Sequence, residues 1–156
     1  MNFWKSKYED TESIKYTLPR RLKQSQFVAD LIQGIIYSDP DANVIVLGDL
    51  NDTINSTPLQ ILGDGGLVNI MRYLNREDRY TYIYQGISQT LDHILVRTNQ
   101  KVLPIVIAPK HINSDFPYLY SRDDNSSIRS SDHDLVHALF GYFDYSIYLP
   151  HILSGD

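Results

Sequence analysis

The chain has 156 residues, of which 42% are hydrophobic and 21% charged, and its formal net charge is −5. These values are typical of one soluble globular domain with its own core and argue against intrinsic disorder. No apolar run approaches the ~20 residues that cross a bilayer, and no signal peptide is visible. The chain as given therefore reads as cytoplasmic, although its compartment stays open. The absence of Cys excludes disulfide scaffolds, thiol catalysis and cysteine zinc sites. The acidic balance argues against binding to nucleic acid through a broad basic surface.

The first part of the chain predicts a lead-in, a helix, a strand and a second, shorter helix. Residues 1–18 are polar and mixed in charge, and we expect an extended or loosely held lead-in. From about Pro19 to Tyr37, apolar residues recur at helical spacing and predict an amphipathic helix. The uninterrupted run Val44–Leu47 is typical of a strand buried on both faces. After a polar loop, Thr57 is expected to cap a short helix that ends at the glycines between 63 and 66.

The rest of the chain predicts mainly strands. The alternating stretch Tyr80–Tyr84 and the stretch Thr90–Val96 are expected to pair, with a turn at Gly86. One helix followed mostly by strands indicates a mixed α/β (α+β) layered domain. The remaining segments are two further strands, a long polar segment that we interpret as a mobile loop, and a tail without assignment: 102–108, 134–142, 110–131 and 143–156.

Acids and histidines stand at three of the predicted strand boundaries. The motifs are GDLND (48–52), LDHILV (91–96) and SDHDLV (131–136). Side chains at one rim of a sheet can converge on a single site. Taken singly, the first and third motifs also fit turns, and the first mimics the start of an EF-hand calcium loop. It fails that pattern at Ile54 and Gln60, where glycine and glutamate are required.

Asp92 is harder to explain as a turn residue, because it lies within an apolar strand. A buried carboxylate costs free energy unless it is paired, so we expect a partner for Asp92. Strand alternation places His93 on the opposite face. We interpret His93 as a surface or edge histidine outside the site.

The three motifs, in this order, resemble the C-terminal part of the endonuclease/exonuclease/phosphatase superfamily, which has the deoxyribonuclease I-like fold. The resemblance covers roughly residues 18–140 and looks closest to bacterial extracellular-nuclease-like members. It implies a four-layer β-sandwich flanked by helices, of which this chain carries the C-terminal half and one of the two sheets. Residues 1–156 would then be a single partial domain, with its motifs within 18–142. A lone sheet would expose an apolar face and favour association.

The resemblance also implies a reaction, the hydrolysis of phosphodiesters of nuclease or phosphatase type with a divalent cation. The cation would be Mg²⁺, or else Mn²⁺ or Ca²⁺. Asp49 would activate the attacking water and contact the metal, and Asn51 would donate its amide to a phosphate oxygen. Asp132 would help to hold the metal. His133 would stabilise the phosphate, and Asp92 would pair with this histidine and orient it.

Two departures from the superfamily pattern bear on catalytic competence. The strand-end glutamate that is a principal metal ligand in the superfamily has no counterpart here. The only glutamates, Glu9, Glu12 and Glu77, all stand in polar, loop-like contexts. The segment 2–6 resembles a mid-domain motif of the superfamily and has Phe3 in place of a phosphate-contacting histidine. On this interpretation the chain starts in the middle of the domain.

Two alternatives to catalysis stay open at this point. One is a binding or assembly module that keeps the fold but is catalytically incomplete, and the other is a structural domain whose rim acids serve only as caps and turns. The expected partners are a phosphate-ester substrate, such as DNA or RNA, and a second copy of the chain or a complementary N-terminal half. Candidates for substrate contact are the segment 110–131 and the basic residues Arg20, Arg21 and Lys23, although a solvated surface is the simpler interpretation.

Overall fold

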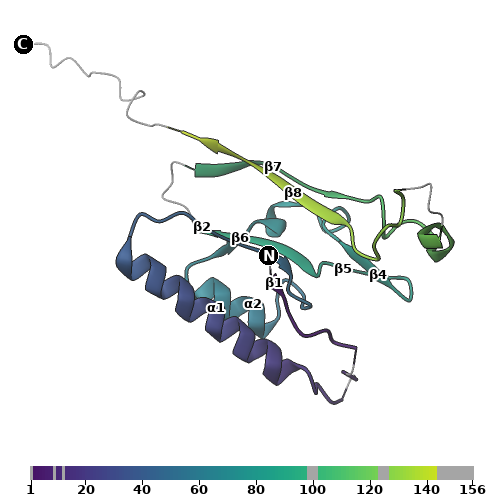
Figure 1. Ribbon diagram of the computed structural model, residues 1–156, viewed down its shortest axis with the longest axis horizontal. Coiled ribbons are helices and arrows are strands. Elements are labelled where there is room, and N and C mark those ends of the chain that lie inside the picture. Colours follow the sequence, from purple (N-terminus) through teal and green to yellow (C-terminus); the bar gives the residue numbers. More distant parts are fainter. Residues whose placement is uncertain (1, 9, 12, 98–101, 123–126, 144–156) are drawn as a thin grey trace, which may run out of the picture.

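Three layers are stacked in the structure, which is a computed structural model (Figure 1). Two helices cover one face of a four-stranded sheet, and a two-stranded sheet lies over the other face. The mixed α/β layered fold predicted from the sequence is therefore confirmed. The structure describes residues 2–8, 10–11, 13–97, 102–122 and 127–143.

The central sheet has the strand order β1-β2-β6-β3. Its strands β2 and β6 run antiparallel, and their register sets Asp49 directly opposite Asp92. Residues that face each other in this way project from the same side of a sheet, so the register alone brings the two carboxylates together. The bounds are β1 (Asn2–Phe3), β2 (Val44–Asp49), β3 (Val68–Asn69) and β6 (Asp92–Arg97).

The N-terminal segment belongs to this sheet. Of the extended or loosely held lead-in expected over residues 1–18, the extended alternative agrees with β1, whereas a loose attachment is wrong at this point. β1 pairs in parallel with the end of β2. Trp4 then donates its N–H to the carbonyl of Asp49 at 3.0 Å, and its side chain is only 5% exposed. The polar composition of the segment concealed this single aromatic anchor, because a segment average does not register one buried residue.

The helices α1 (Leu18–Ser38) and α2 (Thr57–Asp64) pack against the sheet and against each other. They match the two predicted helices, except that Ser56 rather than Thr57 is the N-cap of α2. The core between the helices and the sheet consists of apolar side chains from both layers, among them Val28, Ile32, Val46, Leu59, Leu62 and Leu95.

The hairpin differs from the prediction. β4 (Tyr82–Tyr84) pairs with β5 (Ile87–Gln89), not with Thr90–Val96. Gln85 and Gly86 form the turn with φ values of 50° and 79°, as a type I′ hairpin requires. Because β5 is short and carries little alternation, the sequence merges it with the following strand, which in fact pairs with β2.

The second sheet consists of β7 (Val102–Lys110) and β8 (Leu135–Tyr142), which pair antiparallel as predicted strands. Its inner side chains pack on β6 and on the short 3₁₀ helix η1 (Ile70–Tyr73). The chain therefore contributes strands to two stacked sheets rather than to one, which corrects the expectation of a lone sheet.

β2 is buried on one face only, which corrects the prediction of burial on both. On the face toward the second sheet, Ile45 is 46% exposed and Leu47 is 42% exposed. The physical reason is that β7 and β8 cover β6, through contacts of Val136 and Phe140 with the cluster around Ile94, and leave β2 open.

The segment predicted as a mobile loop, 110–131, has local structure where it is described. It contains the 3₁₀ helix η2 (Tyr118–Arg122), and Arg129 donates its N–H to the carbonyl of Ile112 at 3.0 Å. The remainder of this prediction, at 123–126, and the tail from 144 onward lie outside the described residues. Within the described part of the chain, no helix combines the length and apolar character needed to span a membrane.

Candidate active site

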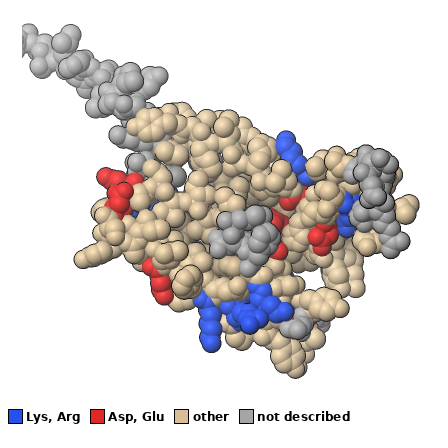
Figure 2. Space-filling model, in the orientation of Figure 1, with Lys and Arg blue, Asp and Glu red and all other residues tan. Residues whose placement is uncertain are grey.

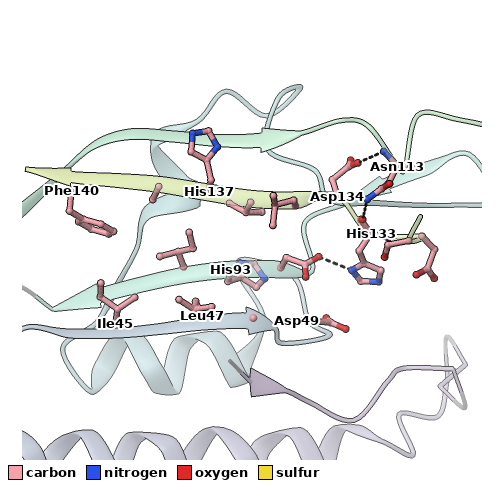
Figure 3. A pocket seen from close by; sticks show the side chains of 17 residues that line it. Ile45, Leu47, Asp49, His93, Asn113, His133, Asp134, His137 and Phe140 are labelled. Atoms are coloured by element: carbon pink, nitrogen blue, oxygen red, sulfur yellow. Dashed lines mark hydrogen bonds and ion pairs between the residues drawn. The ribbon is translucent and has the colours of Figure 1, made fainter. Parts of the chain in front are cut away.

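The carboxylates of Asp49 and Asp92 lie at one rim of the four-stranded sheet, on the face toward β8 (Figure 3). Ile45, Leu47 and Asp49 share this face by strand alternation, so the apolar face turns polar at the last residue of β2. Asp49 therefore stands at the end of a row of apolar side chains on this face of β2. Ile45, Leu47, Asp49 and Asp92 line an open cavity of about 750 Å³ between the two sheets.

His133 reaches this rim from the segment just before β8. Its Nδ1 atom lies 2.6 Å from Oδ2 of Asp92, as the dashed line in Figure 3 marks. The imidazole also packs on the ring of Tyr82, with centroids 4.6 Å apart and planes inclined by 33°. A carboxylate on one side and an aromatic face on the other hold the imidazole in one orientation. Asp92 thus has the partner expected for a carboxylate in an apolar strand.

Asp49 and Asn51 form a tight local unit. The backbone N–H of Asn51 donates to Oδ1 of Asp49 at 2.8 Å, and its side-chain amide donates to Oδ2 at 2.6 Å and to the carbonyl of Trp4 at 3.2 Å. Asn51 has a positive φ of 48°, a conformation that asparagine tolerates better than most residues. The loop GDLND is therefore built around Asp49, and the amide expected to meet a phosphate also orients this carboxylate.

The pKa values of Asp49 and His133 are both raised by their surroundings. Burial raises the pKa of Asp49, and the nearby Asp92 charge adds to this, against the hydrogen bonds from Asn51 and the charge of His133. For His133, burial lowers the pKa, but the hydrogen bond and charge of Asp92 outweigh it, so that the net pKa is raised. The arrangement thus combines a carboxyl that holds its proton more readily with an imidazole that favours its charged form, both useful for acid–base chemistry.

Among the described residues, Asp49, Asp92 and His133 form a compact group of potential metal ligands. Asp132 is exposed and does not belong to this group. Each of these three offers a ligand atom, and these atoms lie within 4.8 Å of one another. Carboxylate oxygens suit Mg²⁺, whereas Nδ1 of His133 is already engaged by Asp92. The donor set therefore fits a cation held by carboxylates better than one held by the imidazole. Asp132 borders the same rim, where it lines a smaller cavity of about 320 Å³ with Asp49 and His133.

His93 does not lie at the surface or at an edge, which corrects that prediction. Alternation does place it opposite Asp92, but β6 is an inner strand and His93 is 1% exposed. Its ring nitrogens bond to the side-chain amide of Asn69 at 3.0 Å and to the carbonyl of Asp52 at 2.9 Å. Burial lowers its pKa to about 4. Through its hydrogen bond to the carbonyl of Asp52, His93 thus stabilises the loop that follows Asp49, on the face of the sheet opposite to Asp92.

The basic group predicted to be a solvated or substrate-contacting surface is divided. Arg21 is 2% exposed and is bound by Asp52 through Nε at 2.8 Å and by Asp10 through a terminal nitrogen at 3.0 Å. It is a buried structural cation, whereas Arg20 and Lys23 are not buried. On the face drawn in Figure 2, the largest group of described Lys and Arg side chains lies at the lower edge, a few others stand apart above it and to the right, and together they do not form a broad basic surface.

A second polar cluster went undetected in the sequence. Asp134 is 3% exposed and accepts hydrogen bonds from Nδ1 of His111 and from the backbone N–H groups of Asn113 and Ser114, at 2.9 to 3.0 Å. Its carboxylate also accepts from the Ser114 hydroxyl. Because Ser114 donates to Asp134 and not to His111, this trio is no nucleophilic triad.

This second cluster contacts the site through the backbone. The side-chain amide of Asn113 donates to the carbonyl of His133 at 2.7 Å (Figure 3). Asp134 stands beside His133 in the motif SDHDLV, and this adjacency is the signal that could have drawn attention to it. Asn113 had no such signal, because it is 20 residues away.

Comparison with known proteins identifies the family and supports the fold. The model of the Endonuclease/Exonuclease/phosphatase family matches residues 5–133. No curated protein matches significantly.

Solved structures similar to this chain include several TDP2 proteins. Truncated TDP2 from Caenorhabditis elegans is 19% identical with a TM-score of 0.55, over 83% of this chain and 51% of that one. D. rerio TDP2 complexed with a single-strand DNA product is 23% identical with a TM-score of 0.57, over 83% and 53%. A humanised D. rerio TDP2 with 14 mutations is 21% identical with a TM-score of 0.55, over 82% and 52%. The chain thus spans about half the length of these structures, and at these identities the likeness concerns the fold.

Proposed function

Because this chain belongs to the endonuclease/exonuclease/phosphatase family, we propose that it carries the catalytic rim of a divalent-metal-dependent phosphodiester hydrolase. The observation that carries the proposal is the convergence of Asp49, Asp92 and His133, from three separate segments, within 4.8 Å. The strand register accounts for the approach of Asp49 to Asp92, but the addition of His133 from a third segment, paired to Asp92, is what supports a chemical site.

Asp49 is proposed to accept a proton from the attacking water. Water is a weak nucleophile and needs a positioned base with a pKa nearer to neutrality than that of a free carboxyl. Burial raises the pKa of Asp49 in this direction, and Asn51 orients its carboxylate through two hydrogen bonds. We infer that the side-chain NH₂ group of Asn51 donates a hydrogen bond to a phosphate oxygen when substrate binds.

His133 is proposed to hydrogen-bond the phosphate as negative charge grows in the transition state. Asp92 occupies Nδ1 and leaves Nε2 as the donor for substrate. The hydrogen bond and charge of Asp92 raise the pKa of His133 against the effect of burial and so favour the charged form of the ring. Asp92 acts through His133 and is therefore a positioning residue.

Asp49 and Asp132 are the residues proposed to hold a divalent cation. Such a cation, when bound, would neutralise phosphate charge and assist ionisation of the water. A glutamate ligand is missing from the described residues, since Glu77 lines a different cavity, together with Arg76 and Arg79. Two carboxylates and water are a sparse but acceptable set for Mg²⁺.

Nucleic acid is the proposed substrate class. The similar D. rerio TDP2 structure holds a single-strand DNA product, which supports DNA for this chain by analogy of fold. The cavity beside Asp49 and His133 is also lined by Lys7, Tyr82 and Tyr84. One cation and two aromatic rings suit a phosphate and a base. Within the family, we place the chain nearest to bacterial extracellular-nuclease-like members.

The exposed faces of the second sheet favour a covering partner. Ile105, Leu135 and Leu139 are 55 to 62% exposed, and contiguous exposed apolar residues mark interaction surfaces. Since the chain spans about half of its structural neighbours, over 51 to 53% of their length, we propose that it corresponds to the C-terminal half of the fold. A complementary N-terminal half would cover these faces and complete the metal ligands. A second copy of the chain is the competing occupant.

The test is Mg²⁺-dependent hydrolysis of bis(p-nitrophenyl) phosphate and of single-stranded DNA by the purified chain. We expect activity that EDTA removes, that Asp49→Asn lowers by roughly 10²–10⁴-fold, and that His133→Ala lowers by roughly 10²–10³-fold. Matched controls are Asp64→Asn at an exposed helix end and His137→Ala, whose ring atom Nδ1 lies 3.0 Å from the carbonyl oxygen of Ala108.

The competing function is a catalytically incomplete binding or assembly module, which the missing glutamate favours. It predicts a folded chain without turnover at any Mg²⁺ concentration. Full activity of both Asp49→Asn and His133→Ala would instead exclude the proposed roles. Adding the N-terminal half of a family member in trans distinguishes incompleteness from loss of function, because only an incomplete site gains activity.

A further inference from the structure

Thr81 is a fully buried polar residue at the base of the β4–β5 hairpin, with 0% exposure. Its hydroxyl oxygen Oγ1 accepts hydrogen bonds from the backbone N–H groups of Leu91 and Asp92, both at 3.1 Å. A side-chain oxygen thus takes the place of a strand partner at the start of β6. Without it, two buried N–H groups would lack an acceptor.

The backbone of Thr81 binds two other segments. Its N–H donates to the carbonyl of Gln89 at 2.9 Å and closes the hairpin, and its carbonyl accepts the N–H of Asp134 at 2.7 Å. Thr81 therefore joins the hairpin, the first residue of β6 and the residue that follows His133. Thr81 is 11 positions from Asp92 in the sequence, whereas His133 is 41 positions from Asp92.

We propose that Thr81 is a positioning residue that sets the distance between Asp92 and His133. One end of the pair is attached to Thr81 through the N–H of Asp92, and the other through Asp134, the neighbour of His133. The inference rests on the proposed function for its catalytic consequence, but the geometry it describes exists without turnover. Hydrogen bonds lose strength steeply when distance and angle are relaxed, so an Asp92–His133 contact of 2.6 Å requires both anchors.

The next residue strengthens the same connection. Tyr82 forms an isolated antiparallel bridge with His133 and packs its ring on the imidazole at 4.6 Å. Tyr82, the residue that follows Thr81, thus helps to fix the position of the imidazole. An ordinary buried threonine would satisfy only its own strand, whereas this one connects both members of the pair.

The experiment compares Thr81→Val with Thr81→Ser. Valine keeps the shape and removes the acceptor, and serine keeps the acceptor. Thr90→Val is the matched control, because Thr90 lies at the other side of the hairpin base and its Oγ1 donates to the carbonyl of Arg79 at 3.0 Å, away from the pair. The first measurement is the far-downfield proton resonance of Nδ1–H of His133, assigned by its loss in Asp92→Asn. The second is the separate determination of kcat and KM with bis(p-nitrophenyl) phosphate and Mg²⁺.

We expect Thr81→Val to shift the resonance upfield or to abolish it and to lower kcat by about 10- to 100-fold with KM changed less than threefold, as loss of positioning predicts. Thr81→Ser and Thr90→Val should keep the parental resonance and kcat. An unchanged resonance in Thr81→Val would overturn the proposal. So would equal losses in Thr81→Ser and Thr81→Val, because they would point to packing and not to the acceptor.

Two further outcomes keep the proposals separate. If the parent chain is inactive but the resonance depends on the acceptor as expected, the proposed hydrolysis fails for this chain and the positioning role stands. If Thr81→Val does not fold, Thr81→Cys replaces it, since sulfur is a weak acceptor of similar size. A resonance and kcat in Thr81→Cys equal to those of the parent would then overturn the proposal, and values between those of the parent and Asp92→Asn would support it.

Discussion

The Nδ1 atom of His133 lies 2.6 Å from Oδ2 of Asp92, although the two residues are 41 positions apart in the sequence. Asp92 belongs to the central sheet, and His133 precedes the last strand of the other sheet. The pair therefore bridges the two stacked sheets at the rim where the cavity between them opens. A displacement of one sheet against the other would therefore change this contact.

Asp92→Asn tests the electrostatic part of this contact. The charge and hydrogen bond of Asp92 raise the pKa of His133 against the opposing effect of burial, so the imidazolium persists to higher pH in the parent. We expect the variant to lose about 10²-fold in kcat and its alkaline limb to move to lower pH. A pH–rate profile measures both, and an unmoved limb with normal kcat would contradict the pairing role.

Acid lability should originate at His93. Its folded pKa of about 4 is depressed below the ordinary 6.5, because burial opposes the charge. The unfolded chain therefore takes up the proton first as pH falls, and stability is lost between about pH 6.5 and 4, by up to roughly 3 kcal/mol. Urea unfolding at pH 7 and pH 4.5 measures the loss.

His133 gives the opposite sign. Its raised folded pKa adds stability below its unfolded value, and this stability disappears as pH rises through the folded pKa. We therefore expect a maximum of stability close to the ordinary histidine pKa. His93→Gln should flatten the acid side of the maximum and His133→Gln the alkaline side, and a variant that flattens the wrong side would refute the assignment.

Asp134→Asn should destabilise the chain by about 2–4 kcal/mol, because it removes a buried charge that several donors face. Burial raises the pKa of Asp134, but hydrogen bonds from Ser114, His111 and the backbone outweigh it and lower the pKa overall. This contribution is thus present above the ordinary carboxyl pKa and is lost as pH falls through the folded value. Asp132→Asn, at the exposed neighbouring position, is the control and should stay within about 0.5 kcal/mol. Equal effects in urea unfolding would contradict the prediction.

Arg21→Ala should cost about 3–5 kcal/mol, since it leaves two carboxylates without their cation in a buried setting. Arg20→Ala, one position earlier, should change stability by no more than about 0.5 kcal/mol. Thermal unfolding of the two variants side by side makes the comparison. Equal melting temperatures would show that the ion pairs of Arg21 with Asp10 and Asp52 do not stabilise the fold.

Elements with strong local periodicity, and residues with distinctive chemistry, could be predicted from the sequence. The helix over 18–38 and the strands β2, β6, β7 and β8 followed from apolar spacing, because burial of one face imposes a period on the chain. Asp92 followed from the cost of an unpaired carboxylate within an apolar strand, whereas Asp49 and His133 followed from the order of the three motifs and the family resemblance they carry. The apolar spacing and the unpaired carboxylate are local properties, readable within ten residues.

The contacts between distant segments could not be predicted in this way and became visible only in the folded chain. The burial of His93 and Arg21 and the hydrogen bond from Asp92 to Thr81 depend on partners more than ten residues away. A threonine, an arginine or a histidine has the same local pattern whether its polar atoms face water or a distant backbone group. The difference arises from packing and hydrogen bonding between segments, and in this chain it separates the structural polar residues from the site.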